Sequence, residues 1–281
     1  MDSSEIKVAG IRSPILQVGD ATSAEAAVFV HGNPGSTSDW LDLLQHVAPF
    51  GRGIAMDMPG FGKAEKPKDF DYTVEGYAAH LGRRVLDAMK VERAHLVLHD
   101  FGGAWGLAWA SRNVERTRSV TLIDIGIMPG FQWHYLARIW RTPLVGELFM
   151  ATTTRWGLKL SLKHGNPRGL PGEYFNEMYD NFDAGTRQAV LKLYRNSSDL
   201  APMIDGWAAA LAPRRLPALV IWGAQDPYVP VRFAEVQRQY FDVKQVLRLE
   251  DSGHWPMIDN PAAVREAVVP FLRARMQPSN I

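Results

Sequence analysis

Short aliphatic runs alternate along the chain with segments whose apolar residues recur every three or four positions. Runs of the first kind predict strands buried on both faces, and segments of the second kind predict amphipathic helices. The predicted strands are residues 26–30, 53–56, 94–98, 119–123, 216–222 and 243–249. The predicted helices are residues 38–47, 73–89, 101–113, 230–240 and 261–275. This alternation predicts an α/β fold with a mostly parallel central sheet flanked by helices.

The alternation is interrupted between about residues 126 and 211, where helical patterns follow one another without a strand. We therefore expect a helical cap, residues 126–211, inserted between the two parts of the core, residues 1–125 and 212–281. The cap contains four tryptophans, four tyrosines and four phenylalanines. These rings either attach the cap to the sheet or line a site for an apolar or aromatic molecule. The last residues, 276–281, are expected to form a frayed tail.

Composition and charge narrow the class of protein. Of the 281 residues 46% are hydrophobic, and 31 Lys and Arg face 30 Asp and Glu, which gives a formal charge of +1. Such a balance does not favour nucleic acid as a partner. The chain has no cysteine, which excludes disulfides and thiolate chemistry. Without a signal-peptide pattern or an apolar stretch of about 18 residues, we expect a soluble, cytoplasmic protein with no membrane partner.

The segment His-Leu-Val-Leu-His-Asp-Phe-Gly-Gly, residues 95–103, leads from a predicted strand into a predicted helix. A tight turn of this kind needs small residues after its pivot, here Asp100. It raises the pivot side chain to the carboxyl end of the sheet, beside the positive end of the helix. Taken alone, the pattern leaves two interpretations open, because Asp100 could be a reactive carboxylate or only the N-cap of the helix.

Three further segments place polar groups after predicted strands. His31-Gly32-Asn33 follows strand 26–30, and such a turn can direct backbone N–H groups toward a neighbouring strand end. Asp226 follows strand 216–222, and His254 follows strand 243–249. In an open α/β sheet these ends meet at one crevice, so a nucleophile, an acid and a histidine would lie together.

Together the turn at 31–32, the elbow at 98–103, the cap and the acid and histidine loops resemble the α/β-hydrolase family over nearly the whole chain. The usual elbow of that family carries serine. An aspartate there resembles the epoxide hydrolases and haloalkane dehalogenases. A carboxylate that attacks an ester carbonyl gives an anhydride, which collapses back, whereas attack on an sp³ carbon gives an alkyl ester that can be hydrolysed.

The resemblance implies a role for each residue. Asp100 attacks the substrate carbon, and His254, oriented by Asp226, activates the water that hydrolyses the ester. The backbone N–H groups of Asn33 and Phe101 would hold the resulting oxyanion. The reaction implied here requires no metal or organic cofactor.

Asp124, at the end of strand 119–123, is a second possible acid, because some dehalogenases resemble this arrangement with their carboxylate there. Asp226 is preferred because its Trp-Gly-x-x-Asp-Pro segment would otherwise have no role.

The two branches differ in how they treat the leaving atom. Dehalogenases of this kind pair a tryptophan directly after the nucleophile with an asparagine in the His-Gly turn or a tryptophan in the cap. Asn33 resembles that asparagine, but Phe101 follows the nucleophile and has no donor. Epoxide hydrolases protonate the oxygen with cap tyrosines. Tyr194, in Leu-Lys-Leu-Tyr-Arg-Asn, resembles one of these, and Tyr135 or His134 would be its partner.

Phe101 in place of the tryptophan argues against a dehalogenase more strongly than Asn33 argues for one. The main expectation is therefore an epoxide hydrolase that converts an apolar or aromatic epoxide to a vicinal diol. The alternative is a haloalkane or haloacid dehalogenase. A further alternative is a non-catalytic binder of a small apolar ligand, which the intact triad disfavours. In each case the partner is a small apolar molecule, and Trp133 and His31 are expected to contact it.

Overall fold

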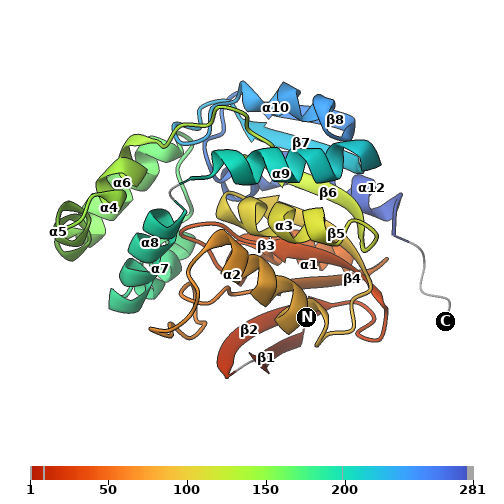
Figure 1. Ribbon diagram of the computed structural model, residues 1–281, viewed down its shortest axis with the longest axis horizontal. Coiled ribbons are helices and arrows are strands. Elements are labelled where there is room, and N and C mark those ends of the chain that lie inside the picture. The colour runs from red at the N-terminus through yellow and green to blue at the C-terminus, as the bar shows by residue number, and fades with distance from the viewer. Residues whose placement is uncertain (1, 9, 198, 277–281) are drawn as a thin grey trace.

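The computed structural model describes residues 2–8, 10–197 and 199–276, which include an eight-stranded sheet with the order β1-β2-β4-β3-β5-β6-β7-β8 (Figure 1). Strand β2 is antiparallel to β1 and β4, and the pairs from β4 to β8 are parallel. The strands are β1 (Asp2–Val8), β2 (Ile11–Val18), β3 (Glu25–Val30), β4 (Arg52–Met56), β5 (Arg93–His99), β6 (Thr117–Ile123), β7 (Pro217–Gly223) and β8 (Asp242–Leu249).

Helices cover both faces of the sheet (Figure 1). On one face α1 (Leu41–Val47) packs against α12 (Pro261–Arg273). On the other face α3 (Phe101–Arg112) lies between α2 (Val74–Ala79) and α9 (Ala201–Leu211). The other helical elements of the core are η1 (Thr37–Trp40), η2 (His80–Leu86), η3 (Ala212–Arg214), α10 (Phe233–Val236), η4 (Gln237–Gln239) and α11 (Pro256–Asp259).

The six predicted strands correspond to β3–β8, each within two residues of its predicted bounds. Every residue of β3 and β4 is buried, which explains their uninterrupted apolar character. The prediction missed β1 and β2, which pair with each other at one edge of the sheet. In β2 polar residues and Pro14 separate the apolar ones, and only part of the strand is buried, so no apolar run marks it.

Among the described residues, the expected cap segment 126–211 contains helices and no strand. Five of these helices stand beside one end of the core (Figure 1). They are α4 (Tyr135–Arg141), α5 (Val145–Thr152), α6 (Arg155–Gly165), α7 (Gly172–Asn181) and α8 (Ala184–Asn196). The sixth, α9, packs on α3 and so contributes to the layer that covers the sheet.

None of the helices in the described ranges combines the length and the apolar character needed to cross a membrane.

The end of the described chain differs from the expectation. Met276, which we expected in a frayed tail, is instead buried, and its side chain lies against Gly51. The rest of that expected tail, residues 277–281, lies outside the described residues.

Candidate active site

Asp100 occupies a sharp turn between β5 and α3, with a φ of 47° and a ψ of −127°. A positive φ at a residue other than glycine costs about 1–3 kcal/mol, and the surrounding structure has to hold it in place. Glycines make the turn possible, because a side chain at Gly32 would collide with Asp100 and one at Gly102 would collide with the carbonyl group of Val30. The Asp100 side chain accepts no capping hydrogen bond from the second or third residue of α3, so the structure does not use it as an N-cap.

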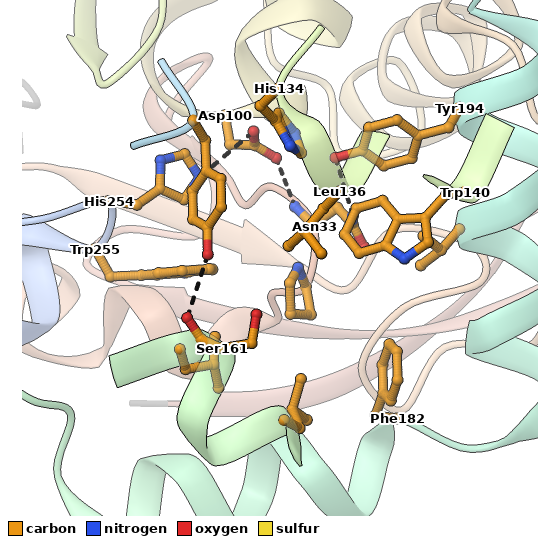
Figure 2. Close-up of a pocket in the computed structure, with 15 residues that line it drawn as sticks. Asn33, Asp100, His134, Leu136, Trp140, Ser161, Phe182, Tyr194, His254 and Trp255 are labelled. Carbon is orange, nitrogen blue, oxygen red and sulfur yellow. Dashed lines mark hydrogen bonds and ion pairs between the residues drawn. The ribbon is translucent and has the colours of Figure 1, made fainter. Parts of the chain in front are cut away.

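The three residues predicted to form a triad meet at the carboxyl ends of the strands. Figure 2 shows two of them, Asp100 and His254. Nδ1 of His254 lies 2.7 Å from Oδ2 of Asp226, and Nε2 of His254 lies 3.5 Å from Oδ2 of Asp100. The other oxygen of Asp226 accepts hydrogen bonds from the backbone N–H groups of Tyr228, at 2.7 Å, and Val229, at 3.1 Å. The loop after β7 therefore fixes the acid, and the acid fixes the imidazole.

The charges of the triad reinforce one another. Burial acts to raise the pKa of Asp100, but the hydrogen bond and the positive charge of His254 outweigh it and lower this pKa to about 2. Burial also opposes a charge on His254, yet the carboxylates of Asp226 and Asp100 raise its pKa well above the usual value. In the free site Asp100 is thus an anion beside an imidazolium, and the anion is the form of aspartate that attacks carbon.

Asp124, the second candidate acid, does not bond to His254. It is fully buried, and its Oδ1 accepts a hydrogen bond of 2.9 Å from the backbone N–H of Gly223 at the end of β7. Burial, reinforced by the negative charge of Asp226, raises the pKa of Asp124 well above its usual value. A carboxyl group that stays protonated cannot stabilise a charged imidazole, so the geometry favours Asp226.

Two backbone N–H groups face the carboxylate of Asp100. That of Asn33 donates to Oδ1 of Asp100 at 2.8 Å, and that of Phe101 also hydrogen-bonds to the carboxylate. Asn33 lies in the loop after β3 and Phe101 is the first residue of α3. This is the pair of donors that the sequence analysis predicted for an oxyanion.

A cavity of about 50 Å³, which we call the α6 cavity, opens in front of Asp100 and His254 (Figure 2). Its lining includes Leu136 and Trp140 from α4, Leu158 and Leu162 from α6, and Val190 and Tyr194 from α8. A second cavity of about 40 Å³, the α9 cavity, also reaches Asp100. Its lining includes Phe101 and Ala104 from α3, Met128 and Trp133, and Ile204 and Trp207 from α9.

Tyr194 and His134 line both cavities. Tyr194 is only 2% exposed, and its hydroxyl oxygen accepts a hydrogen bond of 3.4 Å from the side-chain amide of Asn33 (Figure 2). Burial and the charge of Asp100 raise the pKa of Tyr194 well above its usual value, so the hydroxyl keeps its proton. Burial lowers the pKa of His134 to about 4, so this ring is neutral near pH 7.

The structure places two of the predicted site residues outside the lining of both cavities. Tyr135 lines neither cavity, because as the first residue of α4 it is 47% exposed and its ring lies against His164. His31 is fully buried behind the turn and lines neither cavity. It accepts a hydrogen bond of 2.9 Å from the backbone N–H of Met58 and lies 2.8 Å from the carbonyl oxygen of Gly32, so it braces the loop instead. Trp133 does line the α9 cavity.

Two residues that the sequence analysis did not single out hold the histidine loop. His99 donates from Nε2 to the carbonyl oxygen of His254 at 2.7 Å, and burial lowers the pKa of His99 to about 3. Asn166, just after α6, accepts a hydrogen bond of 2.9 Å from the backbone N–H of Trp255. The only sequence signal for His99 is its place directly before Asp100, and Asn166 has none.

No group of three or more His, Asp or Glu side chains in the described part of the chain is arranged to hold a metal ion.

Comparisons with known proteins show what the chain is similar to. Residues 27–267 match the α/β hydrolase family. A haloalkane dehalogenase of Agrobacterium fabrum is 34% identical over 142 residues, 48% of this chain and 45% of that protein, so the match spans less than half of the relative. A 2-hydroxymuconate semialdehyde hydrolase of a Pseudomonas species is 29% identical over 281 residues, 95% of this chain and 93% of that protein.

Solved structures give the same result for the fold. A loop variant of the haloalkane dehalogenase DbeA from Bradyrhizobium elkanii is similar with a TM-score of 0.85 and 26% identity. The similarity covers 98% of this chain and 99% of that one. The fold predicted from the sequence is thereby confirmed.

Proposed function

The chain belongs to the α/β-hydrolase family, and from this premise we propose that it is a haloalkane dehalogenase that acts through an alkyl ester on Asp100. One observation carries the proposal. A strained, anionic aspartate beside His254 opens onto an apolar cavity in which the amide of Asn33 and the hydroxyl of Tyr194 lie together. The relatives named as haloalkane dehalogenases support this function over the epoxide hydrolase that was the main expectation.

In the first step a carboxylate oxygen of Asp100 attacks the sp³ carbon, and the carbon–halogen bond breaks. The halide leaves with the electron pair of that bond. The amide N–H of Asn33 and the O–H of Tyr194 donate hydrogen bonds to the halide. In dehalogenases that carry a tryptophan directly after the nucleophile, the N–H of that tryptophan is such a donor. Tyr194 would thus compensate for the missing donor at Phe101.

In the second step the ester is hydrolysed. Esterification removes the negative charge of Asp100 that helped to raise the pKa of His254, so the imidazolium releases its proton to solvent. The neutral imidazole then takes a proton from water, and the hydroxide adds to the carboxyl carbon of Asp100. The N–H groups of Asn33 and Phe101 hold the oxyanion until the ester bond breaks. The alcohol leaves with the proton from His254, and the overall products are alcohol, halide and one proton.

The lining of the site supports an uncharged substrate. None of the described residues that line either cavity is a lysine or an arginine. A carboxylate group on the substrate would have to be buried beside the anionic Asp100 without a lysine or arginine to balance its charge, which is unfavourable. We therefore propose haloalkanes and not haloacids.

Epoxide opening is a second candidate, favoured by one observation. The protonated hydroxyl of Tyr194 faces the same cavity as Asp100, and an epoxide oxygen needs such a donor as its ring opens. His134, which lines the cavity beside Tyr194, would be the second donor.

The test traps the ester. The His254→Gln variant should still be alkylated by 1-bromobutane but should not be hydrolysed, so intact-protein mass spectrometry should show a gain of one butyl group. The matched Asp100→Asn variant should show no gain. Bromide release from 1-bromobutane and diol formation from styrene oxide, measured on the unchanged protein, separate the two candidates. If His254→Gln stays unmodified after incubation with a bromoalkane that the unchanged protein consumes, the covalent route is refuted.

A further inference from the structure

Asp100 is reached from two cavities, and these share only three lining residues, Asp100, His134 and Tyr194. The α6 cavity extends from the shared residues under α4, α6 and α8. The α9 cavity extends from them between α3 and α9. The rings of His134 and Tyr194 stand nearly perpendicular, with centroids 6.0 Å apart, and so form the boundary between the two spaces.

From this arrangement we propose that the two cavities hold the two alkyl groups, or arms, of a single reacting carbon. The preferred substrates are then secondary haloalkanes, in which the carbon that bears the halogen carries two alkyl arms. This inference rests on the proposed function and adds the substrate class to it.

The geometry of displacement agrees with two diverging spaces. In the transition state the attacking oxygen, the carbon and the leaving halogen lie on one line, and the other three substituents spread in the plane across it. Two of these substituents therefore point away from each other on either side of Asp100. A primary halide has only one arm and leaves one cavity without substrate.

The volumes limit the length of the arms. The α6 cavity, of about 50 Å³, is only slightly larger than the α9 cavity, of about 40 Å³, so we expect short arms of similar length to fill the two.

The walls of the α9 cavity suit an alkyl arm. Asp100 is the only acidic or basic residue among those described in its lining apart from the neutral His134, and the rest is mostly aliphatic or aromatic. Phe101 contacts Tyr194 edge-to-face at 4.9 Å and stacks on Trp133 at 6.1 Å, so the inner end of this cavity is built of rings. Burying an alkyl arm there removes apolar surface from water, which favours binding of the arm.

The first test compares two isomers. For the unchanged protein, kcat/KM for bromide release should be higher with 4-bromoheptane, which has two three-carbon arms, than with 1-bromoheptane, which has one six-carbon arm. A protein that turns over 1-bromoheptane and rejects 4-bromoheptane would overturn the two-arm assignment and leave the proposed function intact. A protein that releases no bromide from either isomer and gives no ester adduct would refute both.

The second test narrows one cavity. Ala104 lines the α9 cavity, whereas Ala108, one turn further along α3, is buried and lines neither cavity. Ala104→Val should lower the ratio of kcat/KM for 4-bromoheptane over 1-bromoheptane about fivefold. The control Ala108→Val adds the same two methyl groups to the core and should leave this ratio within about twofold. An equal loss for the two isomers in Ala104→Val would overturn the proposal.

A third variant guards against a failure to fold. Ile204→Ala on α9 removes atoms from the wall of the same cavity instead of adding them. It should raise kcat/KM for 5-bromononane, whose arms have four carbons, relative to 4-bromoheptane. No change in this relative rate would show that the α9 cavity does not hold an arm.

Discussion

On the triad side of the cavity the reactive atoms have fixed partners. Nδ1 of His254 is bonded to Asp226, and the second oxygen of Asp226 is held by two backbone N–H groups. On the side of the leaving group the buried Nε1 of Trp140, a hydrogen-bond donor, has no partner in the described part of the chain. The contact between Asn33 and Tyr194, at 3.4 Å, is long for a hydrogen bond.

This difference separates two tasks. A buried polar group without a partner costs about 1–3 kcal/mol, so the leaving-group side retains hydrogen-bonding capacity that a bound molecule can use. The triad is complete before substrate arrives, whereas the leaving-group side is completed by the substrate. Changes in the triad should therefore affect every substrate alike, and changes on the other side should depend on the atom that leaves.

The largest effect is expected at the acid of the triad. Asp226→Asn should lower kcat roughly 10³- to 10⁴-fold for both bromoalkanes and epoxides, because His254 loses the group that orients it and stabilises its charge. Asp124→Asn should lower kcat less than about tenfold, because Asp124 is protonated and bonds to Gly223 instead. Steady-state rates of the two variants provide the measurement. A larger loss of kcat in Asp124→Asn than in Asp226→Asn would make Asp124, just after β6, the acid of the triad.

An intermediate effect is expected at the leaving-group donors. Asn33→Ala should lower bromide release about 10²-fold, as the loss of one fixed donor does at other anion sites. Tyr194→Phe should lower it only about tenfold, because a halide needs no proton. For epoxide opening the same Tyr194→Phe variant should lose roughly 10²- to 10⁴-fold, since the phenol would act as the acid.

The control for this pair is its substrate dependence. If both variants lose the same factor with 1-bromobutane and with styrene oxide, Asn33 and Tyr194 do not distinguish the leaving atoms. The contrast between the two sides of the cavity would then be wrong.

A smaller effect, on stability, is expected where the cap meets the core. Tyr174 of α7 donates a hydrogen bond of 2.9 Å to Asp39 of η1, and burial raises the pKa of Asp39 to about 8. Because this pKa is higher in the folded than in the unfolded chain, the folded state binds the extra proton between about pH 4 and pH 8. This residue should thus lower the free energy of unfolding as pH rises through that range, by at most about 1.4 kcal/mol per pH unit.

Asp39→Asn removes this titration and leaves an oxygen that can accept from Tyr174. The variant should gain stability relative to the unchanged protein from pH 5 to pH 9, measured by urea unfolding at each pH. Parallel stability curves would show that Asp39 is not the titrating group.

The strand-end residues could be predicted from the sequence because short-range rules place them. Asp100, Asp226 and His254 each follow an apolar run, and the parallel order of the sheet brings these ends to one edge. The strained turn at Asp100 also has a signal in the sequence, because small residues stand beside it. The strands β1 and β2 have no such signal, since they lie at the sheet edge and polar residues interrupt the apolar ones in β2.

The cap residues could not be assigned in the same way, because the direction of a cap side chain depends on where its helix starts and docks. His134 and Tyr135 are neighbours in sequence, yet the first lines both cavities and the second, which is 47% exposed, lines neither. His31, which was expected to contact the substrate, lines neither cavity for a related reason. Its place beside Gly32 puts it near the site, but its ring turns inward to Met58.

The smallest effect is expected at Tyr135, and it tests which of these two neighbours serves the site. Nδ1 of His134 accepts a hydrogen bond of 3.2 Å from the N–H of Ala137, so the neutral ring carries its proton on Nε2. Tyr135→Phe should change kcat/KM for either substrate class less than about twofold, because its hydroxyl lies outside both cavities. His134→Asn, which keeps an N-cap acceptor for α4 but removes the ring, should lower kcat/KM more than Tyr135→Phe does. A larger loss in Tyr135→Phe than in His134→Asn would make Tyr135 the second donor after all.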